Sequence, residues 1–140
     1  MYREYGDEVE FLLIYVREAH AGDAWALEVN KREGFEVPLA RTYEEKDGYA
    51  DMCVRKLGIE FPTLVDRMDF PAEADYSAWP ERLYLVDEDG VIVYKGGPGP
   101  FDFEPEELED AIRAELDLAP MAREPKKERP WWRRMLRLPG

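Results

Sequence analysis

A carboxylate and an imidazole stand two positions apart at Glu18 and His20, and this histidine is the only one in the chain. An imidazole ionises near neutral pH, so it can act as an acid, a base or a hydrogen-bond donor. A neighbouring carboxylate can fix its tautomer and raise its pKa. Glu18 and His20 therefore predict acid–base chemistry. The alternative interpretation is a surface or packing histidine beside a solvated glutamate.

Arg82 is a second candidate, because it opens a β-rich run two positions after Pro80. Its planar guanidinium suits a carboxylate or phenolate ligand, and the alternative is an ion pair with Glu81 or Glu18. The peptide bond between Trp79 and Pro80 is a candidate for the cis form, since it directly precedes a predicted buried strand that a proline cannot join. We expect Arg82, at the start of its strand, to lie beside a ligand.

Cys53 is the only thiol of the chain and falls on the apolar stripe of a predicted helix. We interpret it as a small buried hydrophobic residue, with a nucleophile as the alternative. One cysteine and one histidine exclude an internal disulfide and the common zinc sites, so we expect no metal and no bound cofactor. The segment Asp87–Gly90 lacks the ligand spacing of a calcium loop, and Gly96–Pro100 lacks the ending of a phosphate loop.

The apolar run before Glu18 must form the element that positions Glu18 and His20. Val9–Val16 contains seven apolar residues in eight without strict alternation, which is typical of a parallel strand covered on both faces. Ligand crevices of open α/β sheets form at the carboxyl ends of such strands. Residues 1–7 look like the last turns of a helix closed by Gly6, and residues 17–41 predict a long irregular connection.

The other elements carry cap and turn signals. Thr42 and Glu45 form a capping box that starts a helix, whose apolar stripe runs from Ala50 to Leu57 and which Gly58 ends. We further expect a strand over 61–66, a helical turn over 71–79, a hairpin of 83–86 with 91–94, and a final helix from Pro105 to Leu116. This order predicts an α/β fold with a mixed sheet flanked by helices.

Charge divides the chain into two parts. The net charge is −13, yet residues 121–140 contain seven basic and two acidic residues, which leaves 12 basic and 30 acidic ones elsewhere. Such an acidic body repels polyanions, so we expect no nucleic-acid binding. We predict one domain over residues 1–119 and a disordered basic tail over residues 120–140. Trp131, Trp132 and the tail arginines suggest weak membrane contact or partner docking, and the alternative is a tail attracted to its own acidic body.

Sequence signals for secretion or membrane insertion indicate the compartment in which a protein acts. We find neither a secretory leader pattern nor an apolar run long enough to span a membrane. We therefore expect a cytoplasmic protein.

The segment FLLIYVREAHAGDAW, residues 11–25, resembles a strand and loop of the iodothyronine deiodinase family, whose pattern is roughly F-L-x-x-Y-I-x-E-A-H-x-S-D-x-W. FPTLVDRMD, YSAWPERLYLV and GVIVYKGGPGP resemble later segments of that family, in the same order. The resemblance extends over residues 2–116 and leaves only the basic tail outside. It implies a thioredoxin-like fold in which Pro80 is a cis-proline facing the active site.

The resemblance also implies roles for named residues. In the family, the glutamate and histidine of E-A-H and the arginine of P-E-R-L-Y are proposed to hold the iodothyronine and to relay protons. These roles correspond to Glu18 and His20 as catalytic residues and to Arg82 as a substrate-binding residue, with Trp25 closing the loop. The implied partners are a small aromatic or halogenated substrate and a thiol reductant. A peroxide or a protein disulfide is an alternative substrate.

One family segment has no counterpart in this sequence. The family nucleophile, a selenocysteine or cysteine, sits in a G-S-x-x-C/U-x-P-P-F-like segment after a first strand, whereas Cys53 lies on a different helix. Phe61 stands where some members have a second cysteine. We therefore expect a fold that lacks the first strand and the active-site loop, and a chain that is inactive alone. The alternatives are a non-catalytic thioredoxin-like binding module, and a homodimer formed through the unpaired strand.

We expect Met1 to be an internal start, chosen because an upstream in-frame UGA codon was read as a stop, or else a point where the sequence was cut. The DNA upstream should then encode, in frame, a short strand pattern ending in Gly-Ser and a cysteine or UGA codon before Pro-Pro. Sequencing that DNA checks the expectation. An upstream region without this pattern would reject it.

Overall fold

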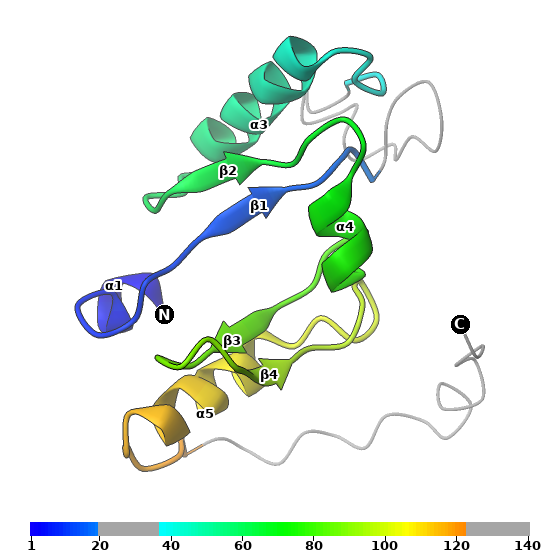
Figure 1. Cartoon of the computed structure of the whole chain (residues 1–140). Helices are drawn as coiled ribbons and strands as arrows, with labels where there is room; N and C mark the ends of the chain where they lie inside the picture. Colours follow the sequence, from blue (N-terminus) through cyan, green and yellow to red (C-terminus); the bar gives the residue numbers. More distant parts are fainter. Residues whose placement is uncertain (20–36, 123–140) are drawn as a thin grey trace.

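The computed structural model describes residues 1–19 and 37–122, and it contains two small sheets with helices packed around them (Figure 1). The elements in chain order are α1 (Tyr2–Tyr5), β1 (Leu13–Tyr15), α3 (Tyr43–Leu57), β2 (Thr63–Val65), α4 (Pro71–Tyr76), β3 (Tyr84–Val86), β4 (Ile92–Lys95) and α5 (Pro105–Glu115). The α/β class and these expected helices and strands are confirmed.

The strands form two pairs, where the sequence predicted one mixed sheet. β1 and β2 are parallel, with Ile14 opposite Leu64. β3 and β4 form the expected antiparallel hairpin, with Leu85 opposite Tyr94. Within the described residues the prediction of a single sheet is wrong, because β1 and β3 do not pair with each other.

β1 is shorter and more exposed than expected. Only Leu13–Tyr15 pairs as a strand, although the apolar run extends over Val9–Val16. α3 packs against β2, but Leu12 is 51% exposed and Ile14 is 38% exposed. The prediction of a strand covered on both faces is therefore wrong, because one face of this pair still touches solvent.

Local cap signals fix the ends of α3 as the sequence predicted. The Thr42 hydroxyl accepts a hydrogen bond from the Glu45 N–H at 3.2 Å, and a Glu45 carboxylate oxygen accepts one from the Arg41 N–H at 2.8 Å. Gly58 ends the helix with a φ of +63°, in the left-handed region that glycine adopts most easily. The predicted apolar stripe is wrong at its end, because Leu57 is 65% exposed.

The hydrophobic core joins the first and last elements of the described chain. Tyr5 of α1, Leu85 of β3, and Leu108 and Ile112 of α5 form its buried cluster. The Tyr5 hydroxyl accepts a hydrogen bond from Arg113 at 2.9 Å, which satisfies a polar group at the edge of this core. The Tyr5 side chain thereby connects α1 to α5 and to β3.

The peptide bond between Trp79 and Pro80 is cis, as expected, and the bond between Gly99 and Pro100, which the sequence analysis did not single out, is also cis. Pro80 lies in the short connection from α4 to β3.

Among the described helices, none combines the length and the apolar character needed to cross a membrane.

Candidate functional site at the carboxyl ends of β1 and β2

Asp66 directly follows β2 and is only 5% exposed. Its Oδ1 accepts hydrogen bonds from the backbone N–H groups of Arg67 at 2.9 Å and Ala72 at 3.2 Å, and its Oδ2 accepts one from the Glu73 N–H at 3.0 Å. These bonds satisfy a buried carboxylate and place negative charge at the positive end of α4. Asp66 therefore fixes the path of the chain from β2 into α4.

Lys46, near the start of α3, is the most deeply buried charged residue of the described chain, at 1% exposure. Its Nζ donates hydrogen bonds to the carbonyl oxygens of Asp66 at 2.7 Å and Arg67 at 3.1 Å, and it lies 4.6 Å from the centre of the Phe70 ring. Burial lowers the pKa of Lys46, against the opposing effect of Asp66 and Glu18. Lys46 thereby joins α3 to the segment that follows β2.

Arg17, two residues after β1, contacts aromatic rings from two other segments. Its guanidinium carbon lies 5.6 Å from the centre of the Phe70 ring and 5.1 Å from that of Trp79. Its Nη2 donates a hydrogen bond to Glu73 Oε1 at 2.7 Å, and its Nε lies 2.7 Å from Glu73 Oε2. A cation over an aromatic face adds about 0.5–2 kcal/mol per contact. Arg17 thus ties the end of β1 to α4 and to the residue before Pro80.

Glu18 is held in place by two hydrogen bonds. Its Oε1 accepts one from the Tyr15 hydroxyl at 3.0 Å, and its Oε2 accepts one from the Ala40 N–H at 3.2 Å. Burial, together with the nearby Glu18 charge, raises the pKa of Tyr15, so this hydroxyl stays a donor. Glu18 is therefore an oriented carboxylate beyond the carboxyl end of β1.

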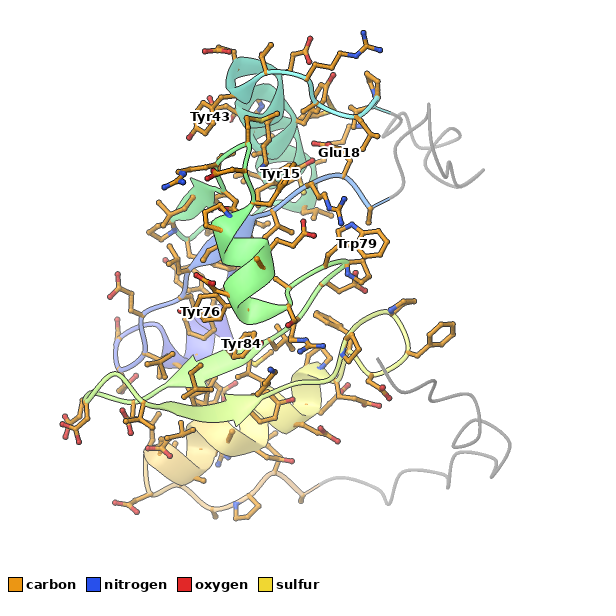
Figure 2. The ribbon with its side chains drawn as sticks, turned by 45° about the vertical axis from the view of Figure 1, so that its right-hand side comes forward. Tyr15, Glu18, Tyr43, Tyr76, Trp79 and Tyr84 are labelled. Atoms are coloured by element: carbon orange, nitrogen blue, oxygen red, sulfur yellow. The ribbon has the colours of Figure 1, made fainter. Side chains whose placement is uncertain are left out.

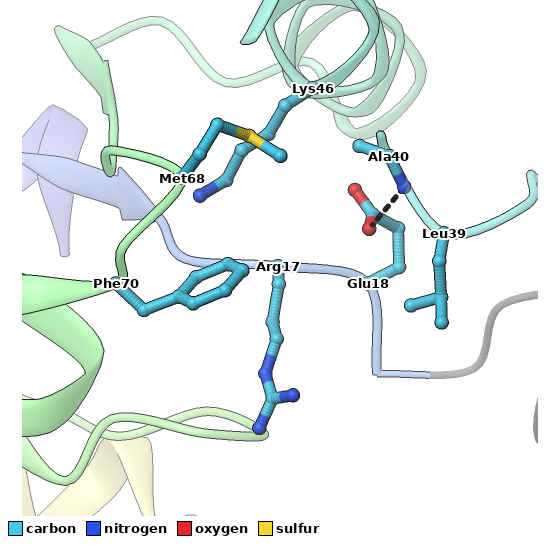
Figure 3. A pocket seen from close by; sticks show the side chains of 7 residues that line it. All are labelled: Arg17, Glu18, Leu39, Ala40, Lys46, Met68 and Phe70. Carbon is cyan, nitrogen blue, oxygen red and sulfur yellow. Dashed lines mark hydrogen bonds between the residues drawn. The ribbon is translucent and has the colours of Figure 1, made fainter. Parts of the chain in front are cut away.

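These side chains surround a pocket of about 150 Å³ (Figure 3). Its walls are formed by Arg17, Glu18, Leu39, Ala40, Lys46, Met68 and Phe70. Pockets for drug-sized ligands are usually ~300–1,000 Å³, so this one suits a single ring or functional group. The walls combine two cations and one carboxylate with apolar surface.

The predicted site residues are only partly brought together. Glu18 lines the pocket, whereas Arg82 does not. The Nε of Arg82 is buried, and the described part of the chain offers it no hydrogen-bond partner. His20 and Trp25 lie outside the described residues. The convergence of His20 with Arg82 therefore stays a prediction.

Trp79, which directly precedes Pro80, contacts a residue of the pocket wall. Figure 2 shows Trp79 and Glu18 on the same side of the molecule, near the end of β1. The Trp79 ring contacts Arg17, which precedes Glu18 in the chain. Among the described ion pairs there is none between Arg82 and either Glu81 or Glu18, so the alternative interpretation of Arg82 as an ion-pair partner is not observed.

Sequence analysis missed Arg17, Lys46 and Asp66. Lys46 precedes Ala50 by four positions, so it lies on the buried face of the helix. A lysine at such a position was the available signal. Asp66 offered another, because an aspartate between a strand and a helix that begins with proline is well placed to cap that helix.

Cys53 lies half-buried on α3, and burial raises the pKa of its thiol. A raised pKa leaves little thiolate at neutral pH, which is the opposite of what a nucleophile requires. The described ranges also contain no group of three or more His, Cys, Asp or Glu side chains that could hold a metal ion.

Comparison with known proteins gives consistent matches. The sequence profile of the iodothyronine deiodinase family matches residues 1–115. A type I iodothyronine deiodinase of Xenopus laevis is 36% identical over 105 residues, which cover 75% of this chain and 39% of that protein. Thyroxine 5-deiodinases of Sparus aurata and Gallus gallus are 35% and 33% identical over 108 and 105 residues, covering 75% of this chain and 38% and 39% of those proteins. The chain thus spans about two-fifths of the length of these relatives.

Replacing Lys46 by methionine should lower the free energy of unfolding by about 1–3 kcal/mol, because a buried and a partly buried carbonyl oxygen lose their donor. Urea denaturation measures the change. The matched control is Lys56→Met, an exposed position on the same helix, where we expect a change within ~0.5 kcal/mol. Equal stability of the two variants would contradict the role of Lys46.

Cys53 should react slowly with iodoacetamide at about neutral pH, because burial disfavours the thiolate. The rate should stay below that of an unfolded thiol and should rise only as pH passes above the ordinary thiol value of 9.0. Mass spectrometry of timed samples gives the rate, and the same chain in urea provides the reference. Fast alkylation of the folded chain near neutral pH would show that the thiol is activated.

Proposed function

Since the chain belongs to the iodothyronine deiodinase family, we propose that residues 1–119 form the substrate side of a deiodinase-type oxidoreductase site with a thioredoxin-like fold. The observation that carries the proposal is the Glu18 carboxylate, held by Tyr15 and Ala40 at the wall of a pocket. Pro80 lies next in sequence to Trp79, whose ring contacts Arg17 beside that pocket. This placement supports a thioredoxin-like arrangement.

Deiodination replaces a carbon–iodine bond of an aromatic ring by a carbon–hydrogen bond. A thiolate or selenolate takes the iodine, and a proton must reach the ring carbon. In the proposal, Glu18 and His20 supply that proton path. The Arg82 guanidinium holds the phenolate or carboxylate of the substrate, because its buried Nε has no partner among the described residues.

The nucleophile in this proposal is not Cys53. Burial raises the pKa of its thiol, and the chain has no other cysteine. We therefore assign the thiolate or selenolate, and the thiol reductant that regenerates it, to groups outside this sequence. The 140-residue chain alone then binds an iodinated aromatic compound but does not release iodide.

The raised pKa of the Cys53 thiol also favours a second function. A chain whose only thiol is protonated at neutral pH can serve as a non-catalytic thioredoxin-like binding module. The two functions make different demands on the pocket. An enzyme site must bind an iodinated aromatic compound, whereas a binding module for another ligand need not.

Equilibrium dialysis with radiolabelled thyroxine tests the substrate side of the proposed site. We expect saturable binding that Arg82→Met weakens by about tenfold, the loss of one charge-assisted hydrogen bond. Arg55→Met is the matched control, since this arginine is exposed and pairs with Asp51 on the surface of α3. Absence of saturable binding, or equal loss in both variants, would contradict the proposed substrate side.

An iodide-release assay with a dithiol reductant tests the assignment of the nucleophile. The chain should release no more iodide than a protein-free control, because Cys53 is not activated. Iodide release that disappears in Cys53→Ser would show that Cys53 is the nucleophile, against the proposal.

A further inference from the structure

The two cations in the wall of the pocket beside Glu18 are directed at groups of the protein itself. Lys46 donates to two carbonyl oxygens at 2.7 and 3.1 Å, and its Nζ lies 4.6 Å from the centre of the Phe70 ring. The Nη2 of Arg17 donates to Glu73 at 2.7 Å. The uncharged side chains of the wall therefore contribute to the choice of ligand.

Met68 is the one sulfur-containing residue among those that line the pocket. It is half-buried, and Figure 3 shows its side chain extending from the turn after β2 toward Ala40. The thioether is unbranched and polarizable, and it offers a weak acceptor and no donor. Dispersion attraction favours contact between such a group and other large, polarizable atoms. Met68 therefore gives the pocket a wall that suits a heavy atom better than a hydrogen-bonding one.

The turn that carries Met68 is fixed by the residues on both sides of it. The carbonyls of Asp66 and Arg67 accept the hydrogen bonds from Lys46, and the Asp66 carboxylate accepts one from the Arg67 N–H at 2.9 Å. The Phe70 N–H donates to the Arg67 carbonyl at 3.1 Å. Met68 thus projects from a held backbone, so its side chain needs little ordering when a ligand binds.

The volume of the pocket, about 150 Å³, limits what can lie against Met68. An apolar cavity of about 150 Å³ in another protein binds benzene or xenon. Iodine stands next to xenon in the periodic table and resembles it in size and polarizability. The pocket therefore has room for an iodine atom and the edge of the ring that carries it.

We propose that Met68 is a specificity-determining residue that selects iodine, through contact between its sulfur and the iodine of an aromatic ligand. The inference rests on the proposed function, because that function makes the ligand an iodinated aromatic compound. Iodine bound to a ring is electron-poor along the extension of its C–I bond, where a thioether lone pair can approach it. Dispersion adds to this attraction, since both atoms are polarizable. Chlorine has both properties to a smaller degree, and a methyl group lacks the first.

Titration of the full 140-residue chain with small phenols tests the inference. The probes are 2-iodophenol, 2-chlorophenol and 2-methylphenol, at about pH 6, where all three keep their hydroxyl proton. NMR of the chain with isotope-labelled methionine methyl groups reports the affinity and the response of Met68. We expect a Kd for 2-iodophenol about fivefold below that for 2-methylphenol, with 2-chlorophenol between them. The Met68 signal should shift on binding.

Two variants separate the sulfur from its surroundings. Met68→Leu keeps nearly the same volume but replaces sulfur by carbon, so it should fold. It should bring the Kd values of 2-iodophenol and 2-methylphenol to within about twofold of each other. Met52→Leu is the matched control and should keep the preference of the parent, because Met52 is half-buried on α3 and does not line the pocket. If Met68→Leu fails to fold, the Kd values and the Met68 signal of the parent chain still decide.

The inference is overturned if the parent binds the three phenols equally or not at all, if the Met68 signal does not respond, or if Met68→Leu keeps the preference for iodine. Equal loss of the preference in Met52→Leu would also overturn it. The dialysis with thyroxine reports separately on the proposed function. Saturable thyroxine binding with an unchanged preference in Met68→Leu would reject the role of Met68 alone. Absence of thyroxine binding, with an iodine preference that depends on Met68, would reject the proposed function alone.

Discussion

The bonds from the Lys46 ammonium to the carbonyls of Asp66 and Arg67 are the constraint on which the site depends. A buried cation is costly unless its donors are satisfied, so α3 can pack on β2 only where these carbonyls meet Lys46. The same turn directs the Asp66 carboxylate onto the start of α4. α4 then presents Glu73 to Arg17. One connected set of polar contacts thereby fixes four segments, namely α3, the turn after β2, α4 and the end of β1.

This network determines which groups remain for chemistry. Lys46 is engaged with backbone carbonyls, and Arg17 is engaged with Glu73. Each cation thus commits part of its donors to contacts that hold the fold together, including two of the three N–H groups of Lys46. Glu18, in contrast, uses its partners Tyr15 and Ala40 only to fix its own direction. The carboxylate is the pocket group best suited to exchange a proton.

Local signals predicted much of the fold, because the interactions that they encode are local. The caps of α3 at Thr42 and Gly58 depend on residues a few positions apart. The exposure of Ile14 depends on which distant segments pack against β1, and the apolar pattern of the strand carries no such information. At the site, Glu18 was identified by its position after a strand and by family resemblance. Arg17 was missed because its partners come from α4 and from the connection that follows it.

The balance of charge around the pocket bears on which ligand it can hold. Arg17 and Lys46 contribute two positive charges, and Glu18 contributes one negative charge, to its walls. Glu73, which pairs with Arg17, and Asp66, whose charge acts on Lys46, carry two more negative charges. The positive charges are therefore fully compensated, and a phosphate would find no excess cation to bind. A phenol ring needs only apolar surface, from Phe70 and its neighbours, and one polar partner, so the pocket favours a weakly polar aromatic group over a strongly anionic one.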